Sequence, residues 1–426
     1  MVTLLGIFLF FTLLGAPLAH AMLAAAILYV ATVPGIGFVV VPQQLQAGLD
    51  SFPLLAVPFF ILAGQLMVEA GVTERLVLLA RALIGHIRGG LAHALVVAGM
   101  ILAGISGSGT ADAAALGGVM IPAMQKERYD TAFAVALSAC AGAIGPIIPP
   151  SIIMIIYGAM GNVSVGQLFL GGALPGVLMG LYLMGTSYVI ARRRGYGPHT
   201  RRAPFRVQIQ ALKQGALDVV LPGIIMGGIV GGVFTPTEAG AVAVAYVLFI
   251  GIVVYKTLNL ERIHRAFQEA IVVLGCVMFI IAAAALIGYI LALLQAPDRI
   301  GEFFAGISNS PAVFLVLVNL LLLILGCLME VTAILVLMTP ILVPILPKFG
   351  IDPVHFGVVM ALNLTIGLLT PPVGLAMYVT CAIGKVSIER YTRACWPFLL
   401  VLVLLLALIT AVPDLVLWLP RHVMRG

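Results

Sequence analysis

The sequence predicts an all-α integral membrane protein, and three observations lead to that class. Of the 426 residues, 62% are hydrophobic and 9% are charged, whereas soluble globular proteins carry about 25% charged residues. Apolar stretches recur along the whole chain, and two parts of the chain resemble each other at a constant spacing. Because every backbone polar group in hydrocarbon needs an internal partner, such a chain is expected to be helical.

The apolar stretches are the candidate membrane segments, because a spanning helix needs about 20 mostly apolar residues. Several are too long for one crossing and contain glycine or proline clusters, which indicates helix pairs, re-entrant hairpins or broken helices. The first has no basic start and no clear cleavage site, so we expect residues 2–33 to form a retained membrane helix and not a signal peptide. The stretches lie near residues 4–33, 52–70, 91–124, 131–160, 168–190, 215–255, 265–294, 312–346, 354–384 and 396–419.

Two parts of the chain repeat each other at an offset of 222 residues. Each copy has an apolar run, a polar or glycine-containing tip, a second apolar run, a polar link and an interrupted helix. Interrupted helices at matching places indicate a transport site at the bilayer midplane, often within inverted repeats. Basic residues follow both copies, so loop charge leaves inversion as a hypothesis. The offset aligns Gly104 with Gly326, Thr110 with Thr332, Pro122 with Pro344, Asp130 with Asp352, and Pro149-Pro150 with Pro371-Pro372.

Two proline pairs are predicted to break the helices of this repeat. Proline has no N–H and clashes with the carbonyl four residues back, so backbone carbonyls near each pair are expected to lose their partners. An unpaired carbonyl in lipid is unfavourable unless protein, water or a cation satisfies it. Oxygen ligands such as these, with the Thr370 hydroxyl, suit sodium. The breaking prolines are Pro149, Pro150, Pro371 and Pro372, and the freed carbonyls would be those of Gly145, Pro146, Gly367 and Leu368.

Residues 104–112 are the most polar stretch inside an apolar region. Their glycines permit close backbone approach, their hydroxyls offer oxygens to a cation, and the following helix would present its N-terminal amides to an anionic substrate. Asp112 either caps that helix or supports an ion site. The candidate residues of this tip are Ser106, Gly107, Ser108, Gly109, Thr110 and Asp112.

Two polar residues of the second copy are candidates for substrate binding. Glu330 is a lone carboxylate in an apolar hairpin, which by default indicates function, although a tip that faces water would also explain it. Asn363 lies on the second interrupted helix and either bridges the site or makes an ordinary interhelical hydrogen bond. Outside the repeats, Thr235 and Glu238 fit a capping box, which is a structural role.

Charged segments outside the tips indicate topology. Six arginines in one loop mark it as cytoplasmic, with contact to anionic lipid as the alternative. Residues 69–88 fit an amphipathic helix at the interface or an arm beside the other helices, with a plain loop as the alternative. The net charge of +6 is no nucleic-acid signature, and the five cysteines fit small packing residues without a disulfide or metal framework. The arginines are Arg192, Arg193, Arg194, Arg201, Arg202 and Arg206.

Motifs of energy-consuming and hydrolytic enzymes are missing from the sequence. It contains no G-x-x-x-x-G-K-[ST] stretch for ATP, no H-E-x-x-H and no G-x-S-x-G. We therefore expect no enzyme activity, and the energy for transport would come from an ion gradient or from the gradient of the solute. This pattern favours a secondary transporter in the lipid bilayer.

Four stretches closely resemble the large membrane subunit, the dicarboxylate-type M subunit, of tripartite ATP-independent periplasmic (TRAP) transporters. The resemblance covers essentially the whole chain and includes residues 48–53. The stretches are SGSGTADAAALGGVMIPAM (106–124), GPIIPPSIIMIIYG (145–158), TPTEAGAVAVAY (235–246) and IDPVHFGVVMALNLTIGLLTPPVGLAMYV (351–379).

The resemblance implies an elevator-type fold with two inverted repeats, a scaffold and a moving transport domain, in the bacterial inner membrane. It implies sodium as the coupling ion and no organic cofactor. The implied partners are a small four-helix membrane subunit, a periplasmic solute-binding protein and a small organic acid such as a C4-dicarboxylate or a sialic acid. The corresponding division is scaffold helices and an interfacial arm (1–90), a first transport repeat (91–175), scaffold helices with the basic loop (176–311), a second repeat (312–397) and a C-terminal helix (398–426).

The resemblance also implies two sodium sites with the substrate between the two tips. One departure from the family pattern is Gly109, where a second consecutive serine is expected, so the first site would lack that hydroxyl. The first site would use Ser106, Ser108 and Gly145, the second Gly326, Thr332, Gly367 and Thr370, and the substrate Gly107, Gly109, Thr110, Asp112, Glu330 and Asn363.

Two other readings of the sequence remain open. The first is a self-sufficient sodium–anion symporter of the elevator class, which would transport without a soluble binding protein. The second is a membrane enzyme or an assembly scaffold. The tips contain no arginine that would mark a carboxylate clamp, so the anionic nature of the substrate rests on the resemblance.

Overall fold

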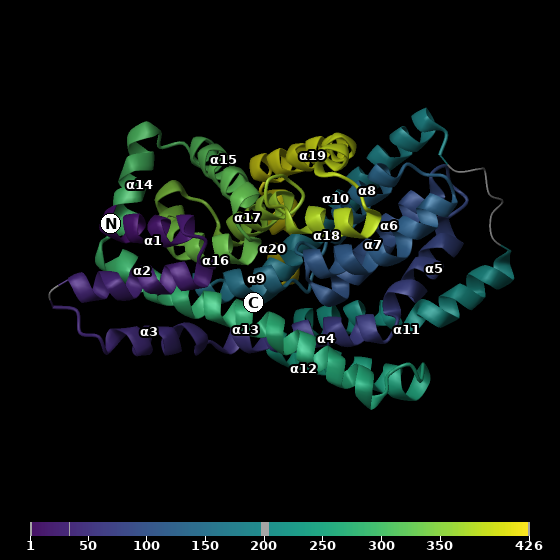
Figure 1. The fold of residues 1–426 in the computed structure, drawn as a ribbon, viewed down its shortest axis with the longest axis horizontal. Helices are drawn as coiled ribbons and strands as arrows, with labels where there is room; N and C mark the ends of the chain where they lie inside the picture. The colour runs from purple at the N-terminus through teal and green to yellow at the C-terminus, as the bar shows by residue number, and fades with distance from the viewer. Residues whose placement is uncertain (1, 34, 197–203, 425–426) are drawn as a thin grey trace.

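The computed structural model is all-α across the residues that it describes, 2–33, 35–196 and 204–424 (Figure 1). In these ranges, eight helices are long and apolar enough to cross a membrane. This confirms the multi-pass helical membrane fold that the composition predicts. The eight segments are Phe52–Glu69, Val165–Arg194, Phe205–Val230, Pro236–Val254, Leu260–Leu293, Pro311–Leu328, Val331–Phe349 and Ile388–Ala411.

The first apolar stretch differs from the prediction, because residues 2–33 form two helices instead of one. They are α1 (Val2–Leu13) and α2 (Leu18–Thr32), and they pack against each other. The chain turns between them at Gly15, whose φ is +83°, and at Pro17, which precedes α2. Glycine adopts positive φ readily and proline lacks the N–H that would continue α1, so this short stretch reverses direction.

A frame of long helices runs along one side of the molecule (Figure 1). Its further elements are α3 (Val40–Leu49), η1 (Phe52–Leu55), α4 (Ala56–Glu69), α11 (Phe205–Val230), α12 (Pro236–Phe249), the π-helical turn η2 (Ile250–Val254) and α13 (Leu260–Leu293). Helix α13 packs against α2, α3 and α4, and α4 packs against α12. Two shorter helices, α5 (Val72–Ile84) and α14 (Ala296–Ile307), each precede one repeat; we call them the arms. The charged segment 69–88 is thus mostly the helical arm α5.

The two repeats fold alike. The first consists of α6 (Gly90–Ser106), α7 (Gly109–Lys126), α8 (Thr131–Gly142), α9 (Ile152–Gly161) and α10 (Val165–Arg194). The second consists of α15 (Pro311–Leu328), α16 (Val331–Leu342) with η3 (Val343–Phe349), α17 (Pro353–Gly367), α18 (Leu375–Gly384) and α19 (Ile388–Ala411), followed by α20 (Asp414–Val423). Both interrupted helices break around the proline pairs. Helices α10 and α19 continue past the predicted repeat ends at residues 175 and 397.

The offset of 222 residues holds up to the proline pairs and again at Pro175 and Pro397, inside α10 and α19, but the helix ends between them have a larger spacing. Helices α9 and α18 end at Asn162 and Lys385, which both have positive φ and are 223 positions apart. The N-caps of α10 and α19, Ser164 and Ser387, have the same larger spacing. The second break therefore contains one extra residue, which the gap-free sequence alignment does not reveal.

The repeats enter the molecule from opposite ends of α13. This helix has 34 residues, which gives it a length of about 50 Å. At its start, Arg265 pairs with Glu69 just before α5, and α5 pairs with the base of the first hairpin through Arg81 and Glu127. Beyond its other end, α14 pairs with the base of the second hairpin. Figure 1 shows α5 and α14 at opposite sides of the molecule, so the repeats are inverted.

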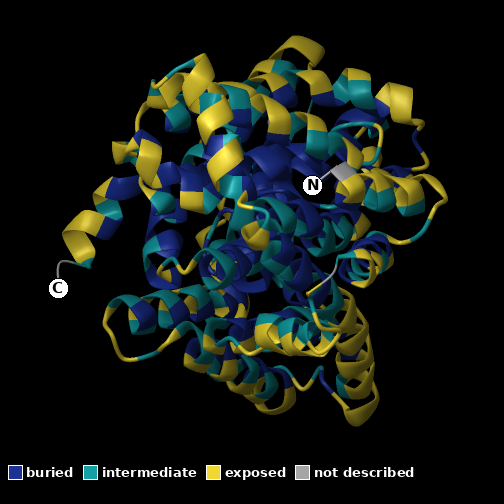
Figure 2. Cartoon of the chain, turned by 90° about the vertical axis from the view of Figure 1, so that its left-hand side faces the viewer, coloured by how far each residue is buried: buried dark blue, intermediate teal, exposed yellow. Residues whose placement is uncertain are grey.

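The buried residues gather in the middle of the molecule (Figure 2). Helix α8 is buried from Ala132 to Gly142 and α17 from Val354 to Gly367, as expected for helices that are apolar on every side. Helix α8 packs against α18 and α19 of the other repeat. The outer faces are also apolar, with exposed side chains such as Val272 and Val316, which suits contact with lipid.

Candidate functional site

A cavity of about 340 Å³ lies between the two hairpin tips and the frame helices α4 and α13. Both tips contribute polar groups, whereas the frame contributes mostly apolar ones. The tip residues that line it are Ser106, Gly107, Ser108, Gly109, Thr110, Ala111, Asp112, Glu330, Val331 and Thr332. The structure therefore brings together most of the tip residues that the sequence singles out.

The first tip rests on the helix break of its own repeat. Gly107, at the end of α6, has a φ of +61°, and a Cβ built there would lie 2.6 Å from the Pro150 carbonyl oxygen. Only glycine fits both this conformation and this close approach. The Ser106 hydroxyl accepts a hydrogen bond from the Ser108 N–H at 3.2 Å and donates a short one to the Asp112 carboxylate. The tip is thus fixed by its own polar groups.

Asp112 is 2% exposed and its Oδ2 has no hydrogen-bond partner among the described residues. The Gly145 backbone lies beside it, since a Cβ built on Gly145 would come within 2.6 Å of Oδ2 and 3.1 Å of the Ser108 carbonyl carbon. A buried carboxylate oxygen without a partner is unfavourable, and a bound cation would offset that cost. Asp112 does not cap helix α7, whose N-cap is Ser108.

Most of the carbonyls that the proline pairs were expected to free are bonded in the structure. The Ser151 hydroxyl donates to the Pro146 carbonyl at 2.6 Å. The Thr370 N–H donates to Gly367 at 3.1 Å and the Met377 N–H donates to Leu368 at 3.3 Å. Tight turns and a capping hydroxyl replace the lost helix bonds, which corrects the prediction at these three positions. Of the four predicted carbonyls, that of Gly145 alone accepts no hydrogen bond among the described residues.

The four residues predicted for the second ion site lie in two places, because only Thr332 lines the cavity. Glu330 caps α16 by accepting from the Ala333 N–H at 3.0 Å, and the Thr332 hydroxyl donates to the same carboxylate at 2.9 Å. Both residues line the cavity. Gly326 and Gly367 instead touch each other behind it, with a Cβ on Gly367 reaching within 2.6 Å of the Gly326 carbonyl oxygen.

Thr370 and Asn363 also lie outside the cavity lining. The Thr370 hydroxyl donates to the Ile366 carbonyl at 2.6 Å. The Asn363 amide donates to the backbone and side-chain oxygens of Asn319 at 2.9 and 2.8 Å. Asn363 therefore makes a hydrogen bond between α17 and α15, as in the second of the two predicted roles, and it does not lie beside the cavity.

The ionisable side chains that line the cavity are acidic. Asp112 and Glu330 line it, and the described lining residues include no lysine, arginine or histidine. Helix α7 begins here with no side chain bonded to its first amides, and helix N-termini favour anions. An anion at this place would therefore meet backbone amides but also two carboxylates, so accompanying cations would be needed to balance the charge.

Gln65 on α4 is a polar lining residue that the sequence analysis does not single out. The only available signal is one amide within the apolar stretch 52–70. Its neighbour Gly64 lies against the first tip, because a Cβ there would be 3.5 Å from the Ser106 Cα. The frame and the tip thus meet closely beside the cavity.

Other predicted positions lie away from the cavity. Thr235 and Glu238 form a capping box at the start of α12, with the Thr235 N–H 2.7 Å from the Glu238 carboxylate. Arg192, Arg193 and Arg194 end α10. Arg201 and Arg202 lie outside the described residues.

Comparison with known proteins gives extensive matches. A family model described as "Tripartite ATP-independent periplasmic transporter, DctM component" matches residues 5–415. The chain is 43% identical to the sialic acid TRAP transporter large permease protein SiaM of Vibrio cholerae, over 96% of this chain and 95% of the relative. It is 41% identical to the C4-dicarboxylate TRAP transporter large permease protein DctM of Pseudomonas aeruginosa, over 87% of each chain.

A solved structure shares the fold. The YdaH transporter of Alcanivorax borkumensis aligns with a TM-score of 0.62 at 15% identity, over 96% of this chain and 98% of that chain. At this identity the match supports the arrangement of helices alone.

Proposed function

Because the chain belongs to the DctM family, the large membrane component of tripartite ATP-independent periplasmic transporters, we propose that it imports a small organic acid together with sodium. Family membership confirms the resemblance seen in the sequence. The relatives are permease subunits and not enzymes, and the chain is a multi-pass protein of the bacterial inner membrane. The observation that carries the proposal is the cavity between two inverted tips, with an unpaired carboxylate oxygen beside a helix break.

The substrate would occupy the cavity. Its volume of about 340 Å³ is at the small end of the roughly 300–1,000 Å³ typical of ligand pockets, which favours one small acid. The amides at the start of α7 would hold its carboxylate, with Gly107, Gly109 and Thr110 as the surrounding tip. The relatives named above for sialic acid and C4-dicarboxylates are the nearest guide to its class.

Sodium would bind first beside Asp112. Its free Oδ2 would be joined by oxygens of Ser106, Ser108 and Gly145: the Gly145 backbone lies beside Oδ2 and close to that of Ser108, and the Ser106 hydroxyl is bonded to Oδ1 of the same carboxylate. A second ion would bind at the other tip and break, near Gly326, Thr332, Gly367 and Thr370. Bound cations would neutralise the two carboxylates of the cavity, so the acid would bind well only after sodium. This order gives coupling a physical basis.

The repeats would move as a transport domain against the frame as a scaffold. The predicted transport segments, 91–175 and 312–397, hold both tips and both breaks, while α4 and α13 form the wall on the frame side. A sliding movement would carry the cavity from one side of the membrane to the other. The partners would be a small four-helix membrane subunit and a periplasmic solute-binding protein that delivers the acid.

The test is uptake into proteoliposomes that contain this chain and its small partner. A panel of labelled organic acids would be offered with their binding proteins, with and without an inward sodium gradient. We expect uptake that needs both sodium and a binding protein. Uptake by this chain alone would favour the self-sufficient sodium–anion symporter, and uptake that ignores sodium would remove the ion sites.

A further inference from the structure

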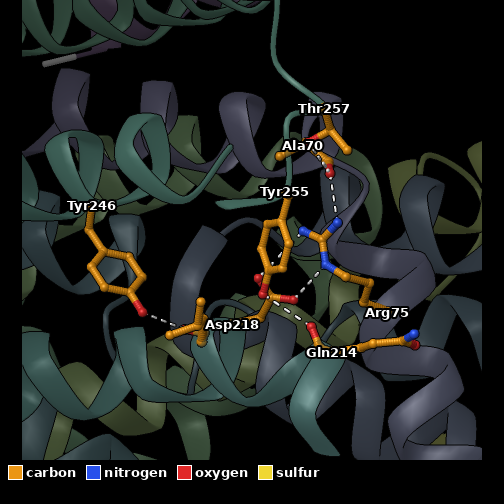
Figure 3. A network of polar contacts seen from close by, with 8 residues as sticks. Ala70, Arg75, Gln214, Asp218, Tyr246, Tyr255 and Thr257 are labelled. Carbon is orange, nitrogen blue, oxygen red and sulfur yellow. Dashed lines mark hydrogen bonds and ion pairs between the residues drawn. The ribbon is translucent and has the colours of Figure 1, made fainter. Parts of the chain in front are cut away.

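Arm α5 is held to the frame by a buried ion pair (Figure 3). The Arg75 Nε lies 2.9 Å from Asp218 Oδ2 in the middle of α11, and its Nη2 lies 3.5 Å from Oδ1. The Asp218 side chain is fully buried and that of Arg75 is 15% exposed. The guanidinium also stacks 3.7 Å from the ring centre of Tyr255, so Arg75 is fixed on two sides by the frame.

The joint between α4 and α5 is fixed as well. The Ala70 carbonyl accepts from Arg75 Nη1 at 2.9 Å and from the Thr257 hydroxyl at 3.0 Å. One residue earlier, the Glu69 carbonyl accepts from Arg262 Nη1 at 3.2 Å. Thr257 lies in the link between α12 and α13, and Arg262 lies in the first turn of α13, so both belong to the frame. This joint therefore offers little freedom for a hinge.

Apolar contacts continue the attachment along α5. Leu79, Ala82 and Ala211 form a small buried cluster between α5 and α11. Gly215 lets the helices approach, since a Cβ there would be 3.0 Å from Leu79 Cδ2. Together with Arg75, these contacts cover α5 from its first turn to its last.

The charged contact of α5 with the first repeat is weaker. Arg81 pairs with Glu127 at 2.6 Å, but their side chains are 52% and 31% exposed. Exposed ion pairs contribute little, whereas breaking a buried pair leaves an uncompensated charge in the interior. The link from α5 to α6 contains two glycines, Gly85 and Gly89, and Gly89 has a φ of +72°. Of these two charged contacts, the one with the repeat is thus the easier to break, although α5 also packs along α6.

Arm α14, in contrast, is attached to its repeat and not to the frame. Asp298 pairs with Lys348 at the base of the second hairpin at 2.8 Å. Phe304 packs on Phe314 with ring centres 5.1 Å apart, and Phe314 stacks on Phe349 at 4.5 Å. These partners all belong to the second repeat.

At the joint between α13 and α14, Gln295 has a φ of +51°. The hydrogen bonds and ion pairs described for α14 beyond this joint reach only the second repeat. The joint is therefore the point at which the chain leaves the frame.

We propose that the two arms belong to different moving bodies. Arm α5 stays with the frame, with Arg75 as its positioning residue, and the hinge of the first repeat lies at residues 85–90. Arm α14 travels with the second repeat, and its hinge lies at Gln295. This inference rests on the proposed sliding movement of the repeats.

The test measures distances between spin labels in the full chain with its small partner, in a variant whose five cysteines are alanine. The reference pair, Val220→Cys on α11 and Gly118→Cys on α7, reports the movement itself. We expect two distances, and the populations of the two conformations that give them should change between sodium chloride and potassium chloride. A single unchanged distance would overturn the sliding movement and this inference with it.

The arm pairs then separate the two ideas. Leu83→Cys on α5 should keep one distance to Val220→Cys and show two to Gly118→Cys. Phe303→Cys on α14 should keep one distance to Leu320→Cys on α15 and show two to Val272→Cys on α13. A moving reference pair with two distances between α5 and α11 would overturn the arm assignment alone.

Variants test the role of Arg75. Arg75→Ala should broaden the distance distribution between α5 and α11, while the matched Arg81→Ala should leave it sharp. If Arg75→Ala does not fold, Tyr255→Leu removes the stacked ring and should broaden the distribution to a smaller degree. Equal distributions in Arg75→Ala and Arg81→Ala, or in Tyr255→Leu and the parent, would contradict the positioning role.

Discussion

Asp112 is the residue at the centre of the proposed ion site of the cavity. One carboxylate oxygen takes the Ser106 hydroxyl and the other faces Gly145 without a partner. Both oxygens of Glu330, the second carboxylate, accept hydrogen bonds, one from the Ala333 N–H at the start of α16 and one from the Thr332 hydroxyl. The two acids are therefore not equivalent, and Asp112 is the one with a free site for a cation.

Asp112→Asn should weaken sodium binding, because it removes the charge while keeping the shape. We expect the sodium concentration for half-maximal uptake to rise at least about tenfold, which corresponds to about 1.4 kcal/mol. The measurement is uptake against sodium concentration. Asp414→Asn, at an exposed pair with Arg421, is the control and should behave as the parent. An unchanged sodium curve in Asp112→Asn would remove this residue from the ion site.

Gln65→Leu tests the frame side of the cavity. Hydrogen bonds to charged groups contribute about 1.5–3 kcal/mol, so losing one to a carboxylate should raise KM for the acid about 10- to 100-fold. The sodium dependence should stay the same, since Gln65 is not among the oxygens around Asp112. Gln125→Leu, at the exposed base of the first hairpin, is the matched control. A normal KM for Gln65→Leu would show that the frame does not touch the substrate.

At the scale of elements, each tip is seated on the break of its own repeat. Gly107 lies against Pro150, and Gly326 lies against Gly367. Each tip and the break that it contacts belong to the same repeat, although they are separated in sequence. Each repeat could therefore assemble its own proposed ion site. Gly109 then lies between Leu368 and Pro146, at the meeting point of both breaks.

Gly107→Ala should displace the first tip. The positive φ alone costs roughly 1–2 kcal/mol for an L-residue, and the new Cβ would overlap the Pro150 carbonyl. We expect loss of uptake and a lower unfolding temperature in detergent. Gly118→Ala on the same hairpin meets open space and should have neither effect. Normal uptake in Gly107→Ala would mean that the tip is not constrained as described.

The capping box of α12 is structural, and its loss should leave transport chemistry alone. Thr235→Ala removes an N-cap side chain, which typically costs about 1 kcal/mol. We expect a lower unfolding temperature with an unchanged sodium curve, and Thr235→Ser should recover the stability. A changed sodium curve in Thr235→Ala would point instead to a role in the site.

The sequence predicts features that depend on local chemistry and misses those that depend on tertiary contact. Proline pairs break helices wherever they fold, so both breaks were predictable. The bonded carbonyls of Pro146 and Leu368 were not, because their donors, the Ser151 hydroxyl and the Met377 N–H, lie at the starts of α9 and α18, whose placement after each break the sequence does not specify. Gln65 and the Asn363–Asn319 bond depend on which helices become neighbours, and the turn after α1 depends on a single glycine and proline.

At the scale of the whole molecule, the inverted repeats place two equivalent tips on one cavity from opposite sides. The frame supplies a mostly apolar wall, so the polar groups that line the cavity belong almost entirely to the repeats. Such a division would allow the proposed site to move as one piece. In the proposed mechanism, cations would bind beside the acidic side chains before the cavity accepts an acid.

The coupling of the acid to sodium is tested most directly by following labelled sodium and the labelled acid together into proteoliposomes that contain the complex and its binding protein. We expect sodium to enter only when the acid is present, in a fixed ratio to it, and Asp112→Asn to lower both fluxes. Entry of the acid without any movement of sodium would rule out the proposed coupling.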